Sequence, residues 1–168
     1  GGMFQLRVEP RYAKIRELVQ GGDLGDLVRV IWIMTDWFRS EAYYQSGGWR
    51  ATWKGEGGGV LLNQCPHNLD LFQWLFGMPQ QVTGFLNFGR YHQIEVEDDA
   101  TLYFRYPDGK NATFITSTGE APGINRLEVI AERGTLTVDE GMIRWVRNET
   151  EASIFSDTAE SGFTKPET

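Results

Sequence analysis

The sequence predicts an α+β domain in which an open, largely antiparallel sheet of about six strands carries helices on one face. Three observations lead to this prediction. Apolar residues recur at helical spacing in two segments before residue 77, they alternate after residue 82, and tight-turn motifs join several of the later segments. Strands joined by tight turns run antiparallel, and helices outside a run of strands pack against the sheet. A length of 168 residues suits one domain.

The first half of the chain contains two predicted helices and one strand. Residues 9–20 have Pro10 in the first turn, apolar residues at helical spacing and a Gly21-Gly22 stop. Residues 28–35 are β-branched and aromatic, which favours a strand. Residues 63–76 return to helical spacing and end at Gly77, so we expect one continuous helix there.

Six further strands are predicted in the second half, where apolar and polar residues alternate. The hairpin signal is strongest at 107–110, because Pro107 presets a turn and Gly109 accepts a positive φ. Weaker turn signals occur at 133–134 and 140–141. The expected strands are 82–88, 100–106, 112–117, 126–131, 135–138 and 142–146.

Apolar side chains on these strands need a cover. We expect Phe85, Tyr103, Phe104 and Phe114 to form an apolar strand face. If the helices cover only one side of the sheet, the other side becomes a candidate interface for a homo-oligomer, because large exposed apolar patches are rare on monomers. A sheet curled over its own core is the alternative. Residues 1–148 form the predicted domain, and the polar tail at 149–168 is expected to be partly disordered.

Composition excludes several classes of function. A net charge of -7 and a pI near 4.9 oppose binding to nucleic acid or to an anionic membrane. One cysteine cannot form an internal disulfide, and two histidines are too few for a closed zinc site, so we expect no metal. Neither a membrane span nor a signal peptide is recognisable, which favours a cytoplasmic protein.

The chemistry-bearing segment is 37–70, a loop rich in glycine and aromatic residues that precedes the second predicted helix. Asn63 and His67 lie four residues apart and would share a helix face, where the helix N-terminus favours a neutral imidazole as general base. Asp70 is close enough in sequence to orient that ring. The alternative is that Asn63 caps the helix and His67 has no catalytic role.

Aromatic and arginine side chains in the same segment are typical of a carbohydrate site. Tyr43, Tyr44, Trp49 and Trp53 offer faces for sugar C–H groups, and Arg39 and Arg50 offer donors to hydroxyls or phosphates. Packing of a long loop would explain the same aromatics.

Three other features carry weaker signals. The glycines at 55–59 match no phosphate-loop motif, and Cys65 has no nearby second histidine that could activate it. The acidic stretch at 95–99 is expected to be a solvated strand entry, since it lacks the ligand spacing of a calcium loop.

The same segment resembles the C-terminal substrate domain of the Gfo/Idh/MocA family of NAD(P)-dependent oxidoreductases, which act on sugars, polyols and their derivatives. The resemblance covers roughly residues 4–146. The motifs that carry it are Gly48-Trp49-Arg50, the run from Glu56 to Leu61, Gln64, His67, Leu69-Asp70-Leu71, Trp74-Leu75 and Gly77.

The resemblance implies a fold like the C-terminal domain of glyceraldehyde-3-phosphate dehydrogenase, and a separate N-terminal Rossmann domain that binds most of the NAD or NADP. The 168-residue chain alone is then expected to be inactive and to bind no cofactor tightly. His67 matches the catalytic histidine. Asn63, Gln64, Arg39, Trp49 and Arg50 are the implied substrate-binding residues, with Asn63 standing where many members have aspartate. A non-catalytic carbohydrate-binding or oligomerisation module, or a member that has lost activity, remains the alternative.

Overall fold

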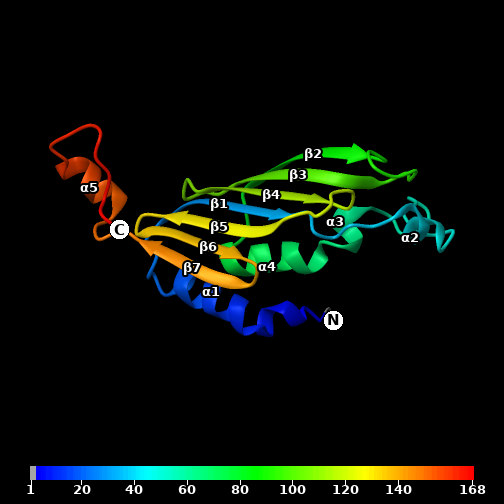
Figure 1. The fold of residues 1–168 in the computed structure, drawn as a ribbon, viewed down its shortest axis with the longest axis horizontal. Helices are drawn as coiled ribbons and strands as arrows, with labels where there is room; N and C mark the ends of the chain where they lie inside the picture. Colours follow the sequence, from blue (N-terminus) through cyan, green and yellow to red (C-terminus); the bar gives the residue numbers. More distant parts are fainter. Residues whose placement is uncertain (1–2) are drawn as a thin grey trace.

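A single seven-stranded sheet forms the body of the molecule, with helices packed on one face (Figure 1). The computed structural model describes residues 3–168. The strands are β1 (Leu27–Met34), β2 (Gln81–Phe88), β3 (Glu97–Arg105), β4 (Asn111–Ser117), β5 (Asn125–Ala131), β6 (Gly134–Asp139) and β7 (Met142–Arg147). Their order across the sheet is β2-β3-β4-β1-β5-β6-β7, and only the β1–β4 pair is parallel. The predicted open, largely antiparallel architecture is therefore confirmed.

The helices are short, and one predicted helix is divided. They are η1 (Gln5–Val8), α1 (Pro10–Gln20), α2 (Glu41–Gln45), α3 (Val60–Asn63), α4 (Pro66–Phe76) and α5 (Ala152–Thr158). The expectation of one helix over 63–76 was wrong: α3 ends at Asn63 and α4 begins at Pro66. Proline has no amide proton and its ring blocks the carbonyl four residues earlier, so it begins a helix rather than continuing one.

The core lies between the sheet and the helices α1 and α4. Trp32 of β1 stacks on Phe72 of α4 at a centroid distance of 6.4 Å, and Phe114 of β4 meets both rings edge-on. Trp32 and Phe114 are almost completely buried. Burying such a side chain contributes roughly 1.5–3 kcal/mol, so these rings fix α4 against the sheet.

The four aromatic residues expected on one strand face lie on two faces. Phe104 and Phe114 are buried under the helices, whereas Phe85 and Tyr103 are 67% and 37% exposed. Tyr103 and Phe104 are consecutive in β3, and consecutive strand residues point to opposite faces. The open face of the sheet thus carries exposed aromatic rings from β2 and β3.

The polar tail contains more structure than its sequence predicted. Helix α5 lies within it, and the Glu149 amide donates to the Glu167 carbonyl at 2.9 Å. Within residues 3–168, the structure contains no helix with the length and apolarity needed to cross a membrane.

Candidate functional site

Helix α3 begins against the start of β3, and a glycine makes this contact possible. A Cβ on Gly59 would lie 1.9 Å from the Glu97 carbonyl oxygen, so no larger residue fits. The Glu97 carboxylate accepts the amides of Gly59 at 3.0 Å and Leu61 at 3.2 Å. Two backbone amides at the start of α3, which have no partner within the helix, are therefore hydrogen-bonded to the Glu97 side chain. The glycine run at 55–59 allows this segment to pack closely against β3.

Two carboxylates of the acidic stretch are buried at the start of β3, which corrects the expectation of a solvated strand entry. Glu97 is 6% exposed and Asp98 is 0% exposed. Asp98 accepts the backbone amides of Arg90, Tyr91 and His92 at 2.8–3.1 Å. These donors replace the water that a carboxylate would otherwise require, and they hold the 89–95 loop in place. The sequence pattern of acidic residues gave no sign of this burial.

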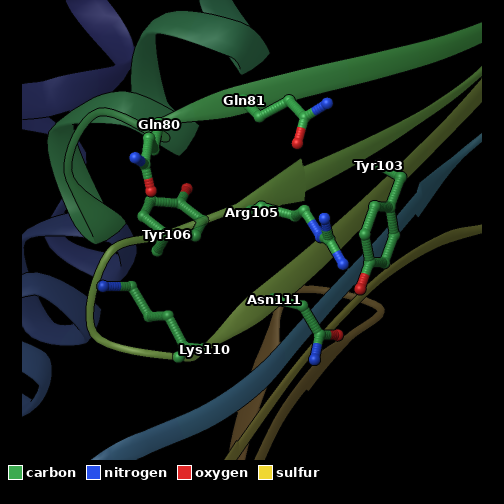
Figure 2. Close-up of a pocket in the computed structure, with 8 residues that line it drawn as sticks. Gln80, Gln81, Tyr103, Arg105, Tyr106, Lys110 and Asn111 are labelled. Atoms are coloured by element: carbon green, nitrogen blue, oxygen red, sulfur yellow. The ribbon is translucent and has the colours of Figure 1, made fainter.

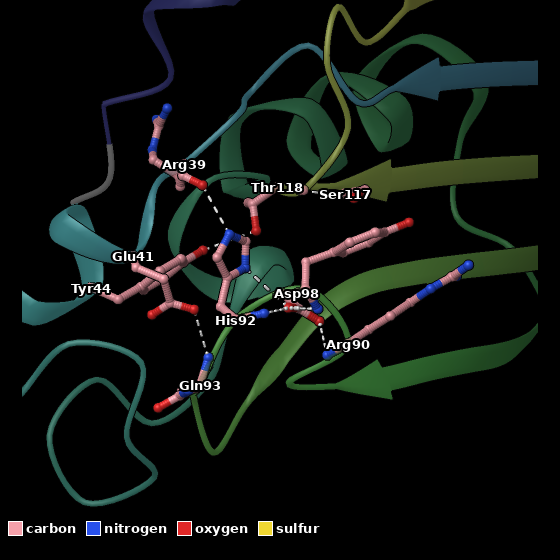
Figure 3. Close-up of polar contacts among 11 residues, drawn as sticks. Arg39, Glu41, Tyr44, Arg90, His92, Gln93, Asp98, Ser117 and Thr118 are labelled. Carbon is pink, nitrogen blue, oxygen red and sulfur yellow. Dashed lines mark hydrogen bonds and ion pairs between the residues drawn. The ribbon is translucent and has the colours of Figure 1, made fainter.

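His92 connects that loop to the segment after β1, as Figure 3 shows. Its Nδ1 lies 3.1 Å from Asp98 Oδ2, and its Nε2 donates to the Arg39 carbonyl at 2.8 Å. The Arg39 amide in turn donates to the Thr118 carbonyl at 2.8 Å. Both ring nitrogens of His92 therefore lie within hydrogen-bonding distance of a protein oxygen, which fixes the orientation of the ring. No motif singled out His92, although it fixes the backbone of a predicted substrate-binding residue.

Four of the predicted substrate-binding residues gather around one tyrosine. We call Arg39, Tyr43, Trp49, Arg50 and Gln64 the Tyr43 cluster. The Cζ atoms of Arg39 and Arg50 lie 5.1 and 4.6 Å from the centroid of the Tyr43 ring, and Arg50 Cζ also lies 4.7 Å from that of Trp49. The Tyr43 hydroxyl accepts from Arg50 Nη1 at 3.1 Å, and Gln64 Nε2 lies 3.5 Å from it.

The other aromatic residues of the loop lie outside this cluster. Tyr44 packs on the His92 ring at 4.7 Å, and its hydroxyl lies 2.9 Å from the Thr118 hydroxyl. Trp53 packs beside Phe88 of β2 at 6.0 Å. Beside the cluster is a depression of about 670 Å³, whose lining includes Tyr44, Arg50 and His92.

His67 and Asn63 lie at the junction of α3 and α4, within three residues of Gln64 in the sequence. His67 is in the first turn of α4, half-buried, and its Nδ1 is buried without a hydrogen-bond partner among residues 3–168. Asn63 is exposed at the end of α3. Because the helix is interrupted between them, the expectation that both project from one helix face does not hold.

Asp70 does not orient His67, as the sequence had suggested. Its carboxylate instead accepts from Arg7 Nε at 2.7 Å and Arg7 Nη2 at 2.5 Å. The neighbour of the His67 ring is Phe4, edge-on at 5.8 Å. Cys65, between the two helices, is fully buried, and burial raises the pKa of its thiol to about 12. A neutral, enclosed thiol is a poor nucleophile.

A second depression, of about 630 Å³, lies where β2 begins and the β3–β4 hairpin turns (Figure 2). Its lining includes Arg105, Tyr106 and Lys110. Burial raises the pKa of Tyr106 to about 12, and Lys110 is paired with Asp108 at 2.5 Å. None of the predicted site residues lines it, and β2 separates it from the α3 end of the sheet.

Comparisons with known proteins agree with the fold of this chain. A family model described as the GFO/IDH/MocA C-terminal domain matches residues 12–137. The WlbA dehydrogenase from Chromobacterium violaceum, solved with NADH and UDP-GlcNAcA, is 26% identical with a TM-score of 0.78, over 96% of this chain and 48% of that one. No match was found among curated proteins.

Two further solved structures share the fold. The WlbA dehydrogenase from Bordetella pertussis, also with NADH and UDP-GlcNAcA, is 24% identical with a TM-score of 0.79, over 99% of this chain and 53% of that one. A levoglucosan dehydrogenase with NADH and levoglucosan is 17% identical with a TM-score of 0.72, over 89% of this chain and 43% of that one. The chain spans about half the length of the solved structures that it matches.

Proposed function

Because the chain belongs to the Gfo/Idh/MocA family, whose C-terminal domain it matches, we propose that it supplies the substrate side of an NAD(P)-dependent dehydrogenase. The substrate is a sugar, a polyol or a sugar derivative, and the reaction is hydride transfer. The observation that carries the proposal is the Tyr43 cluster, whose member Gln64 lies three residues before His67 in the sequence and contacts the Tyr43 hydroxyl. Stacking faces, forked donors and an imidazole are what a carbohydrate oxidation requires.

The cofactor's phosphates do not fit the glycine-rich segment of this chain. The amides of Gly59 and Leu61 already bind Glu97, and Gly59 is closed off by the β3 backbone. We therefore assign NAD or NADP mainly to a separate N-terminal dinucleotide-binding domain of the parent protein. When bound, the nicotinamide supplies hydride acceptance or donation. The chain alone is expected to be inactive.

His67 is the proton-transfer residue in this proposal. Its ring is half-buried in the first turn of α4, and an imidazole can act as the general base that takes the proton of a substrate hydroxyl. Asn63 is exposed beside it and has both a donor and an acceptor for a neighbouring hydroxyl, but it is not a base. Gln64 is 3% exposed. In this proposal it positions the Tyr43 hydroxyl and takes no part in the proton transfer.

Turnover by the native-length protein tests this assignment. His67→Asn removes the base while keeping a similar shape, and we expect kcat to fall by roughly 10²- to 10⁴-fold with little change in substrate Kd. Asn63→Asp is the matched variant one helix earlier, and it should retain turnover. If His67→Asn kept the unaltered kcat, the assignment of His67 would be wrong.

We also propose that the open sheet face forms a homo-oligomer. The support is the exposure of Phe85 and Tyr103 on the face that no helix covers. Phe85→Glu should shift the sedimentation coefficient toward that of the 19.1 kDa monomer, whereas Phe163→Glu in the exposed tail should not. Equal sedimentation of Phe85→Glu and the unaltered chain would contradict an interface here.

A further inference from the structure

Two arginines share one tyrosine ring in the Tyr43 cluster, and neither has a counterion. Arg39 and Arg50 both lie within about 5 Å of the Tyr43 centroid, yet neither forms an ion pair with any residue between 3 and 168. Like charges placed this close repel each other, which opposes folding. The stability of the fold therefore does not explain why both arginines contact the same ring.

Most donors of these guanidinium groups have no acceptor in the protein. Arg39 Nη1 donates only to the neighbouring Phe38 carbonyl at 3.0 Å, and Arg39 Nε is buried without a partner. Arg50 Nη1 donates to the Tyr43 hydroxyl. A guanidinium has five N–H donors, and a buried donor without an acceptor is costly. The remaining donors of Arg39 and Arg50 therefore have no acceptor among residues 3–168 and are available to a ligand or to solvent.

Carboxylates near the cluster are committed elsewhere. Glu41 accepts the amide of Gln93 at 2.9 Å, and Glu95 accepts the amide of Trp53 at 3.2 Å. Glu56 accepts the amide of Ala51 at 2.8 Å. Each carboxylate accepts a loop amide, and none of the three forms an ion pair with Arg39 or Arg50.

We propose that the Tyr43 cluster binds an anionic group of the substrate, so that the substrate is a sugar derivative carrying a carboxylate or a phosphate. This inference rests on the proposed function. Both groups offer oxygens that match the forked donors of arginine. Both forks contact the Tyr43 ring, and Gln64 connects Tyr43 to the α3–α4 junction, three residues before His67 in the sequence. The anionic group thus anchors the sugar beside the proton-transfer residue.

Fluorescence titration of the 168-residue chain tests the inference, since Trp49 lies against Arg50 and reports on the site. The probes are glucuronate for a carboxylate, glucose 1-phosphate for a phosphate monoester, UDP-glucose for a diphosphate, and neutral glucose. At least one anionic probe should bind about tenfold more tightly than glucose. Its identity distinguishes the two sources of charge. Equal affinity for all four probes would overturn the inference.

Variants locate the effect. Arg39→Gln and Arg50→Gln should each weaken the best anionic probe by about tenfold or more, with an intermediate loss for Arg50→Lys, which keeps charge but not the fork. Arg16→Gln is the matched control, because Arg16 also stacks on an aromatic ring, Trp74, at 4.3 Å. A loss with Arg16→Gln equal to that with Arg50→Gln would contradict the assignment. Circular dichroism confirms that each variant is folded.

Turnover separates this inference from the proposed function. If the native-length protein oxidises neutral sugars better than their anionic counterparts, the inference fails and the dehydrogenase proposal stands. If the chain binds an anionic sugar but the native-length protein turns over none of the probes with NAD or NADP, the anion site stands and the dehydrogenase proposal fails.

Discussion

The chain contains two arrangements in which two arginines flank one aromatic ring, and they differ in a single respect. Arg7 and Arg16 lie 5.8 and 4.3 Å from the Trp74 ring, and Asp70 neutralises Arg7 through two hydrogen bonds. Arg39 and Arg50 lie at similar distances from Tyr43 without any carboxylate. The fold therefore supplies a counterion to one arginine of the first pair, where Arg7 joins η1 to α4, and to neither arginine where we place the substrate.

Among the variants that test this comparison, one that releases the backbone around the Tyr43 cluster should lower the free energy of unfolding the most. Asp98→Asn removes a fully buried carboxylate that accepts three amides and faces His92, and should lower the free energy of unfolding by about 3 kcal/mol. Urea titration measures this. The matched control is Asp99→Asn, whose pair with Arg90 is half-exposed and should contribute less than about 1 kcal/mol. Equal losses would show that the Asp98 network does not hold this site.

Removing Arg7, the arginine that has a counterion, should cause the next largest loss of stability. Arg7→Gln leaves the Asp70 carboxylate, which is only 8% exposed, without its bidentate partner. We expect a lower thermal unfolding midpoint than for the unaltered chain, though a smaller loss than for Asp98→Asn. Lys14→Gln breaks a surface pair with Glu17, in which the two side chains are 51% and 66% exposed, and should leave the midpoint unchanged. Indistinguishable midpoints for the two variants would remove one side of the comparison.

The smallest expected change in stability at neutral pH is that of a Cys65 variant. Cys65 lies between Gln64 of the cluster and the start of α4. Burial raises the pKa of its thiol from 9.0 to about 12. The folded chain then keeps a proton that the unfolded chain releases above pH 9, so stability falls as the pH rises from 9 to 12. Cys65→Ala should make this fall shallower in urea titrations. Tyr106, whose pKa is also raised to about 12, keeps part of the decline. An identical pH slope for both chains would contradict the burial argument.

The fold was largely predictable because it depends on local periodicity. The 107–110 hairpin followed from Pro107 and Gly109, and Gly109 adopts φ +89° between β3 and β4. The break between α3 and α4 was misjudged because helical spacing outweighed Pro66. Pairing across the sheet, with β1 inserted between β4 and β5, depends on contacts between distant residues that periodicity does not contain.

The sequence predicts the residue types of the Tyr43 cluster but not their arrangement. Arg39, Trp49, Arg50 and Gln64 are the substrate residues that the resemblance implies, and their role stays a prediction, whereas nothing in the sequence indicates Tyr43 as their shared platform. The role of His92 depends on Asp98, which reads as a surface residue in an acidic run. Burial of a carboxylate by three backbone amides is set by tertiary structure, so it leaves no sequence pattern.

The thermal unfolding midpoint of Arg50→Gln, measured with and without the best anionic sugar, tests the central claim most directly. If Arg50 is an uncompensated charge kept for a ligand, its removal should leave the free energy of unfolding of the unliganded chain within about 0.5 kcal/mol or raise it, and should abolish the rise that the ligand causes. A midpoint lowered as much as by Arg7→Gln, with the ligand-induced rise intact, would contradict the claim and make Arg50 a structural residue.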